Sequence, residues 1–119
     1  MKALSDKIYY AEKDILEIIK IDFDLINDTE WYQLYQHKID KTIWRLDKWD
    51  KHQVQFFVRL SSIDNWTDFD DTELRIELLQ KTRGTDMSRK CIWRECIRPS
   101  LNGLVYCEIH AYKEMGIRK

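Results

Sequence analysis

Three cysteines and one histidine gather near the C-terminal end of the sequence, and they constrain the fold more than any other feature. Their spacing is Cys91-x4-Cys96-x10-Cys107-x2-His110, so every cysteine of the chain lies within residues 91–110. Zinc favours four tetrahedral ligands, and sets of thiolates with an imidazole are typical of closed structural sites. The spacing therefore predicts that these four residues bind one structural Zn²⁺ ion.

The residues between the two ligand pairs agree with this interpretation. Asn102-Gly103 is a strong short hairpin signal. Cys107 and His110 are three positions apart, so both would face the same side of the first turn of a helix. We therefore expect a turn that carries the first two ligands, a β-hairpin, and a short helix that carries the last two.

This layout resembles the small treble-clef zinc modules of phage and bacterial DNA-associated proteins, including some HNH endonucleases. The matching positions are Cys91, Cys96, Gly103, Cys107 and His110. The resemblance implies that the four cysteine and histidine side chains are structural zinc ligands, and that the protein has a phage or mobile-element origin. It does not imply nuclease activity, because no catalytic His-Asn-His set follows His110. It covers residues 91–110 alone, and no family is recognised for the rest.

The scarcity of turn residues indicates helices elsewhere. The chain has only three glycines and one proline, and an all-β fold of this size would need many more. We therefore expect a mainly α fold. Residues 1–84 would form an acidic bundle of three or four helices, residues 85–90 a linker, and residues 91–119 the zinc-binding module.

Apolar periodicity and capping signals place the expected helices. Apolar residues recur at helical spacing over residues 4–20 and again over residues 31–49, with residues 21–28 as a connector between them. A further helix starts at the Asp70–Glu73 capping box and ends at Gly84. Residues 53–63 fit either a helix or a strand, and we prefer a helix because no partner strand is evident.

Charge is distributed unevenly along the chain. Residues 1–86 carry 13 Lys and Arg against 18 Asp and Glu, whereas residues 87–119 carry 7 against 3. A basic segment beside an acidic body indicates an anionic partner for the basic segment. The first residues lack the apolar core of a signal peptide, and no run approaches the ~20 apolar residues of a membrane span. We expect a cytoplasmic protein without a membrane partner, whose thiols stay reduced.

The sequence offers no catalytic arrangement. His37 and His52 are interpreted as solvated helix residues. No nucleophile lies beside a base and an orienting group, and there is no glycine-rich phosphate loop. We expect a protein that is not an enzyme.

Two functions remain open. The first is a small zinc-containing regulatory protein that contacts nucleic acid through its C-terminal module. The candidate contact residues are basic or aromatic: Arg89, Lys90, Trp93, Arg94, Arg98, Lys113, Arg118 and Lys119. The alternative is an adaptor or inhibitor that binds a protein through its acidic, aromatic-rich body. Its candidate interface residues are Trp66, Asp68, Asp70 and Asp71.

Overall fold

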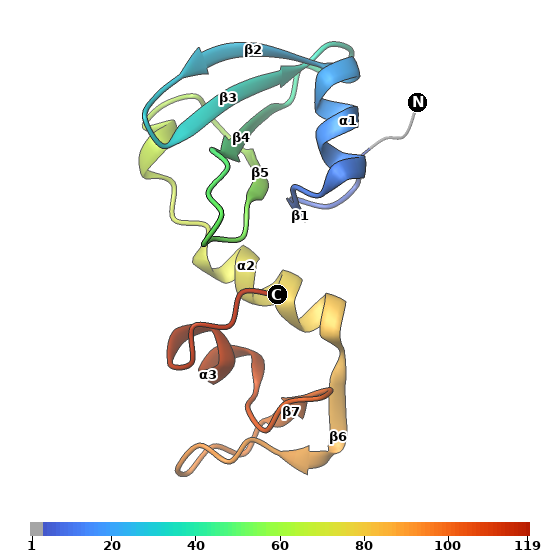
Figure 1. Cartoon of the computed structure of the whole chain (residues 1–119), viewed down its shortest axis with the longest axis vertical. Coiled ribbons are helices and arrows are strands. Elements are labelled where there is room, and N and C mark those ends of the chain that lie inside the picture. The colour runs from blue at the N-terminus through green and yellow to red at the C-terminus, as the bar shows by residue number, and fades with distance from the viewer. Residues whose placement is uncertain (1–3) are drawn as a thin grey trace. The chain divides into compact units, whose positions relative to one another are not determined.

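The computed structural model describes residues 4–119 and divides the chain into two compact units (Figure 1). The first unit ends at Asp71, and the second runs from Thr72 to Lys119. Seven strands form two antiparallel sheets, and the three α-helices are short. The expected helical bundle is therefore wrong, because the chain is mainly sheet.

The first unit contains a five-stranded antiparallel sheet, one α-helix and one turn of 3₁₀ helix. Its elements are β1 (Ile8–Tyr10), α1 (Lys13–Asp22), β2 (Phe23–Asp28), β3 (Tyr32–His37), β4 (Ile43–Asp47), β5 (Phe56–Leu60) and η1 (Trp66–Asp68). The strand order is β1-β5-β4-β3-β2. Strands β2 to β5 thus follow one another as a meander, and β1 joins the sheet at its edge beside β5.

Side-chain alternation along β4 gives the sheet two buried faces. Trp44 and Leu46 pack on one face with Ile15 and Ile19 of α1 and with Phe57 of β5. The Trp44 and Phe57 rings stack with centroids 4.8 Å apart. Arg45, between them in sequence, is 1% exposed on the other face. A strand that is buried on both sides loses the alternation between apolar and polar residues that would identify it in sequence.

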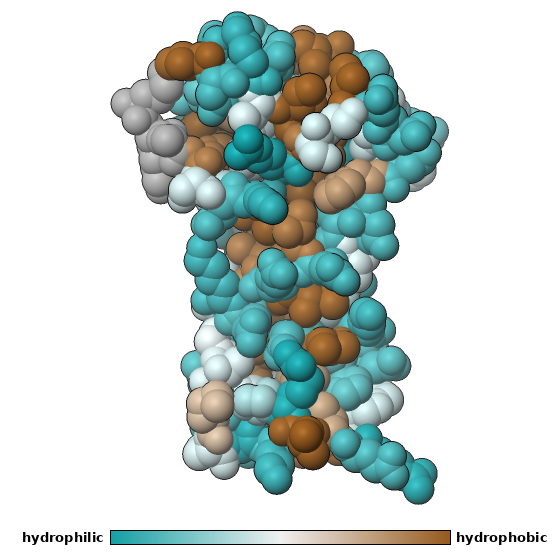
Figure 2. All heavy atoms as spheres, turned by 180° about the vertical axis from the view of Figure 1, so that it is seen from behind, coloured by the Kyte–Doolittle hydropathy of each residue, from teal (hydrophilic) through white to brown (hydrophobic). Residues whose placement is uncertain are grey.

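Apolar side chains also reach the surface. Figure 2 shows apolar atoms lying among hydrophilic ones on the side of the molecule that it draws. In the first unit the most exposed large apolar side chains are Ile21, Trp31, Ile39 and Trp49.

The helix expected over residues 31–49 is replaced by the β3–β4 hairpin. Its turn is made without glycine or proline, because Lys41 adopts a positive φ of 63°. Asp40 stabilises the turn, since its Oδ1 accepts hydrogen bonds from the Thr42 backbone N–H at 2.9 Å and from the Thr42 hydroxyl at 2.6 Å. The scarcity of glycine therefore does not exclude tight turns here, and the aromatic and β-branched content of the segment favours strands.

The other expectations for the first unit change for a related reason. Residues 8–10 leave the expected first helix and form β1, which pairs with β5. Strand β5 resolves residues 53–63 in favour of a strand at Phe56–Leu60. The expected connector over residues 21–28 contains β2. Each strand of the β1–β5 pair is stabilised by a partner about fifty positions away, which local periodicity does not reveal.

The second unit has two α-helices and a two-stranded sheet. Its elements are α2 (Thr72–Arg83), β6 (Thr85–Lys90), β7 (Pro99–Leu101) and α3 (Glu108–Lys113). The expected helix before Gly84 is confirmed as α2, and Gly84 follows it at a φ of +73°. Strand β6 covers the residues expected as a linker. The small core cluster consists of Leu79, Leu101, Ala111 and Tyr112.

We expect Gly84→Ala to destabilise the second unit. A left-handed φ costs a non-glycine residue about 1–2 kcal/mol. In addition, a Cβ at position 84 would lie 2.8 Å from Asn102 Nδ2, which donates to the Arg83 carbonyl oxygen at 3.2 Å. The measurement is urea unfolding followed by backbone amide signals of α2 and α3.

Gly103→Ala is the matched control for this prediction. Gly103 has a similar φ of +76°, but no heavy atom beyond its chain neighbours lies within 4 Å of the point that a Cβ would occupy there. Gly103→Ala should therefore show the backbone cost alone, and Gly84→Ala should cost more. Equal losses of unfolding free energy would contradict a role for the close approach of Asn102.

Candidate metal centre

The four predicted ligands come together around a loop and the start of a helix. Cys91 follows β6, and Cys96 lies five residues later in a tight turn. Cys107 caps the N-terminus of α3, and His110 lies in the first turn of that helix. Their ligand atoms all lie within 4.8 Å of one another. A Cys3His group that can bind one metal ion is therefore present.

The individual distances fit tetrahedral zinc. The sulfurs of Cys96 and Cys107 lie 3.9 Å apart. His110 Nδ1 lies 3.4 Å from Cys91 Sγ and 3.3 Å from Cys107 Sγ. Zn–S bonds of about 2.3 Å and Zn–N bonds of about 2.1 Å, at tetrahedral angles, place sulfurs ~3.8 Å apart and sulfur and nitrogen ~3.6 Å apart. The donor atoms are thus spaced as a single zinc ion requires.

Backbone hydrogen bonds form the turn that carries Cys91 and Cys96. The Cys91 N–H donates to the Arg98 carbonyl oxygen at 2.9 Å, and the Cys96 N–H donates to that of Trp93 at 3.0 Å. Glu95 adopts a positive φ of 63° within this turn. The Trp93 N–H points at Cys91 Sγ, 3.4 Å away. The turn therefore aims both sulfurs inward and offers an N–H to one of them.

Electrostatics explains why these thiols favour a cation. Burial raises the pKa of Cys91, but N–H groups of Cys107 and Trp93 and the neighbouring His110 and Cys96 side chains lower it more, leaving a pKa of about 7. Burial raises the pKa of Cys107 to about 11, and the adjacent Cys96 and Cys91 side chains raise it further than its own N–H donors can offset. Three thiolates this close repel one another, and a bound divalent cation relieves that repulsion.

The environment of the ligands is enclosed and ordered. Cys91 is 5% exposed and Cys107 is fully buried. The Trp93 ring stacks on the His110 imidazole with centroids 5.0 Å apart and an interplanar angle of 17°. Four protein ligands fill a tetrahedral shell and leave no open position for a substrate water, which is typical of structural metal sites.

The basic candidates occupy two kinds of position. Arg98 pairs with the buried Glu108. Arg118 donates to the Tyr112 carbonyl oxygen at 2.7 Å and lies over the Tyr112 ring. The other basic candidates have exposed side chains: Arg89, Lys90, Arg94, Lys113 and Lys119. Trp93 is 38% exposed while it stacks on His110, so part of its surface remains accessible.

The acidic candidates also divide. Asp71 is buried and forms an ion pair with Arg45, with Oδ2 3.2 Å from Nη2. Trp66 is half-buried beside Tyr32. Asp68 and Asp70 are exposed. Asp71 and Trp66 therefore have evident packing roles inside the first unit.

The two remaining histidines differ from their interpretation as solvated helix residues. His37 is a buried residue of β3, and its Nδ1 accepts the N–H groups of Ile39 and Asp40, each at 3.2 Å. It also packs edge-on against Phe23. His52 is exposed, but it lies in a turn after β4. His37 thus supports the β3–β4 turn.

Sequence reasoning missed the buried arginine at the centre of the first unit. Arg45 lies in the run IWRLD, where its neighbours Trp44 and Leu46 are buried. A lone arginine inside an apolar segment with strand-forming residues is the signal that could have identified it, because such a charge must find partners when the strand is buried.

Comparisons of this chain with protein-family models, with curated proteins and with solved structures find no match. The candidate metal centre is therefore defined by the chain's own residues. Within residues 4–119, no helix has the length and apolar character needed to cross a membrane.

Proposed function

We propose that this protein is a small zinc-containing regulatory protein whose second unit contacts nucleic acid. The observation that carries the zinc assignment is the convergence of three sulfurs and one imidazole nitrogen within 4.8 Å. Zinc is the metal that best matches this donor set and its tetrahedral spacing. The likeness of residues 91–110 to treble-clef modules supports the same assignment.

The proposed zinc has a structural role, and the proposal assigns no catalysis. Four protein ligands complete the coordination shell. The core cluster of the second unit is small, with Leu79, Leu101, Ala111 and Tyr112 as its buried members. Metal binding, on the order of 10–16 kcal/mol in zinc-finger peptides, would supply much of the stability of such a unit. Reduced thiols are required as ligands, which favours a reducing compartment such as the cytoplasm.

Charge and exposure support the nucleic-acid contact. Residues 72–119 hold ten Lys and Arg against six Asp and Glu. Arg89, Lys90 and Arg94 are exposed on or beside the turn that holds the first two cysteines. Basic side chains pair with phosphates, and the accessible part of Trp93 can stack on a base. Arg98 and Arg118 hold structural contacts, so we assign them to the architecture of the unit.

The test is fluorescence anisotropy of the zinc-loaded protein with labelled duplex DNA, single-stranded DNA and single-stranded RNA. With about three phosphate contacts, duplex affinity should fall about 40-fold between ~50 mM and ~200 mM salt, and single-strand affinity about 20-fold. Arg94→Glu should weaken binding at low salt and reduce the salt slope by about one.

Arg59→Glu is the matched control, because Arg59 is an exposed arginine of β5 in the first unit. It should leave the affinity nearly unchanged. Absence of saturable binding at low salt would overturn the proposal, and so would equal effects of the two charge reversals. Either result would direct attention to a protein partner.

A further inference from the structure

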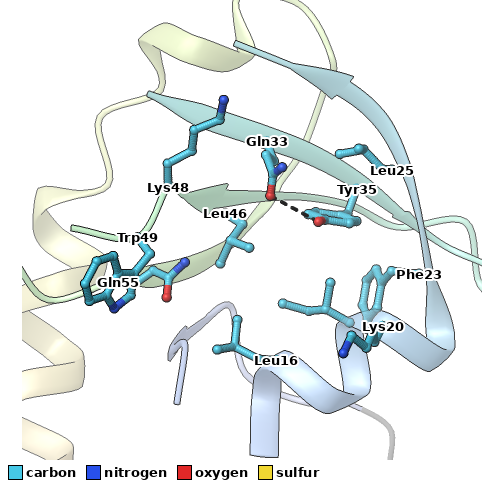
Figure 3. Close-up of a pocket in the computed structure, with 11 residues that line it drawn as sticks. Leu16, Lys20, Phe23, Leu25, Gln33, Tyr35, Leu46, Lys48, Trp49 and Gln55 are labelled. Atoms are coloured by element: carbon cyan, nitrogen blue, oxygen red, sulfur yellow. Dashed lines mark hydrogen bonds between the residues drawn. The ribbon is translucent and has the colours of Figure 1, made fainter. Parts of the chain in front are cut away.

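A groove in the first unit lies between α1 and strands β2, β3 and β4 (Figure 3). Its volume is about 860 Å³, within the ~300–1,000 Å³ typical of small-molecule sites. Side chains from four elements and from the loop before β5 contribute to it, so the fold of the whole unit shapes the groove. No residue of the candidate metal centre takes part.

The floor of the groove is the hydrophobic core itself. Ile19, Phe23 and Leu46 reach it from α1, β2 and β4, and each is at most 5% exposed. The walls are apolar and open to solvent: Leu16 is 38% exposed, Leu25 50% and Trp49 74%. An indole and two leucines held at a concave apolar surface favour an apolar occupant, because covering them removes apolar area from water.

The charges of the groove are all of one sign. The first unit is acidic, with fifteen Asp and Glu against ten Lys and Arg up to Asp71. Yet the residues that line the groove include Lys20 and Lys48 and no carboxylate. Lys48 is already paired, since its Nζ lies 2.6 Å from Asp28 Oδ1. Among residues 4–119 no such ion pair involves Lys20, which lies beside Phe23 on the α1 side of the groove (Figure 3).

Neutral polar groups complete the lining. The Tyr35 hydroxyl donates to Gln33 Oε1 at 3.1 Å, as Figure 3 shows. Burial, and then the nearby charge of Asp28, raise the pKa of Tyr35, so its hydroxyl stays protonated at neutral pH. Gln55 is held in place because its Nε2 donates to the Asp47 carbonyl oxygen at 2.7 Å. These groups offer hydrogen bonds near the apolar floor without adding negative charge.

We propose that this groove binds a small amphipathic anion, an apolar chain or ring that carries one carboxylate. The apolar body lies on Ile19, Phe23 and Leu46 and is covered at the side by Trp49. The carboxylate pairs with Lys20. A single negative charge is the match, because Asp28 already neutralises Lys48 and leaves one cation for the ligand.

The test uses decanoate below its micelle concentration as the probe, with the full-length, zinc-loaded, ¹⁵N-labelled protein. Decan-1-ol and decyltrimethylammonium have the same chain but a neutral and a positive head. The indole N–H signal of Trp49, identified by its loss in Trp49→Phe, reports occupation of the groove. Decanoate should shift this signal at lower concentration than decan-1-ol, and decyltrimethylammonium should bind most weakly.

Two pairs of variants on α1 locate the contacts. Lys20→Gln should weaken decanoate binding about three- to fivefold, the range of an exposed ion pair, and should leave decan-1-ol binding unchanged. Its control is Lys13→Gln, an exposed lysine of α1 outside the groove. Leu16→Glu places a carboxylate in the groove and should weaken decanoate binding more than tenfold. Its control is Ile21→Glu, at an exposed position outside the lining.

Three results would overturn the assignment. Equal affinity for decanoate and decan-1-ol would remove the role of charge. Unchanged decanoate binding in Leu16→Glu would place the ligand elsewhere. A Trp49 shift that depends on protein concentration alone would show that a second copy of the chain fills the groove.

Discussion

Replacing Cys107 with serine is expected to abolish tight zinc binding and to unfold the second unit while the first unit stays folded. Cys107 Sγ is fully buried, 3.9 Å from Cys96 Sγ and 3.3 Å from His110 Nδ1. Serine is a poor zinc ligand, so the shell loses a member at its most enclosed position. The measurements are zinc content per chain and amide hydrogen exchange across residues 72–119.

A chelator should reproduce this result in the unmodified protein, because the metal's binding free energy is also folding free energy. Exchange protection should fall in α2 and α3 and persist in the five-stranded sheet. His110→Asn provides a second ligand variant, and His52→Asn is its matched control because His52 is exposed outside the site. If Cys107→Ser retains one tightly bound zinc, or if chelation leaves α3 protected, the structural role is wrong.

Arg45→Met is expected to destabilise the first unit by about 3–5 kcal/mol, the range for breaking a buried ion pair at one partner. The Arg45 side chain is 2% exposed. Its Nη1 donates to the carbonyl oxygens of Trp66 at 3.1 Å and Phe69 at 3.0 Å, and its Nη2 lies 3.2 Å from Asp71 Oδ2. Methionine has similar bulk but would leave the Asp71 carboxylate and these carbonyls without the guanidinium.

Urea unfolding of the first unit measures this cost, with Arg59→Met as the control. Arg59 is an exposed arginine, and its replacement should change the unfolding free energy by less than ~0.5 kcal/mol. Adding Asp71→Asn to Arg45→Met should recover part of the loss, because it removes the stranded charge. Equal costs for the two arginine variants would contradict a buried electrostatic role for Arg45.

The sequence predicted the metal-ligand group because its information is local. Four residues within a twenty-residue segment, with fixed spacing and a hairpin signal, need only a turn and a helix start to meet. The helix before Gly84 was predictable for the same reason, since a capping signal and a C-terminal glycine mark its two ends. In both places, neighbouring residues determine the structure.

The five-stranded sheet was not predictable from the same kind of signal. Residues such as Leu34 and Tyr35 fit a helical stripe, yet they lie on opposite faces of β3. The turn at Lys41 uses a left-handed lysine where glycine would be expected. Arg45 is buried because carbonyls and a carboxylate more than twenty positions later surround it. Those stabilising contacts are distant in sequence, so periodicity alone favours the wrong element.

The position of β1 at the edge of the sheet has a consequence for the order of folding during synthesis. Ile8 pairs with Val58, fifty positions later, whereas β2, β3 and β4 pair with their immediate successors. Contacts between distant residues form more slowly than local ones, and chains fold from the N-terminal side as they emerge from the ribosome. The meander should therefore assemble first, and the earliest strand to be synthesised should be the last to join the sheet.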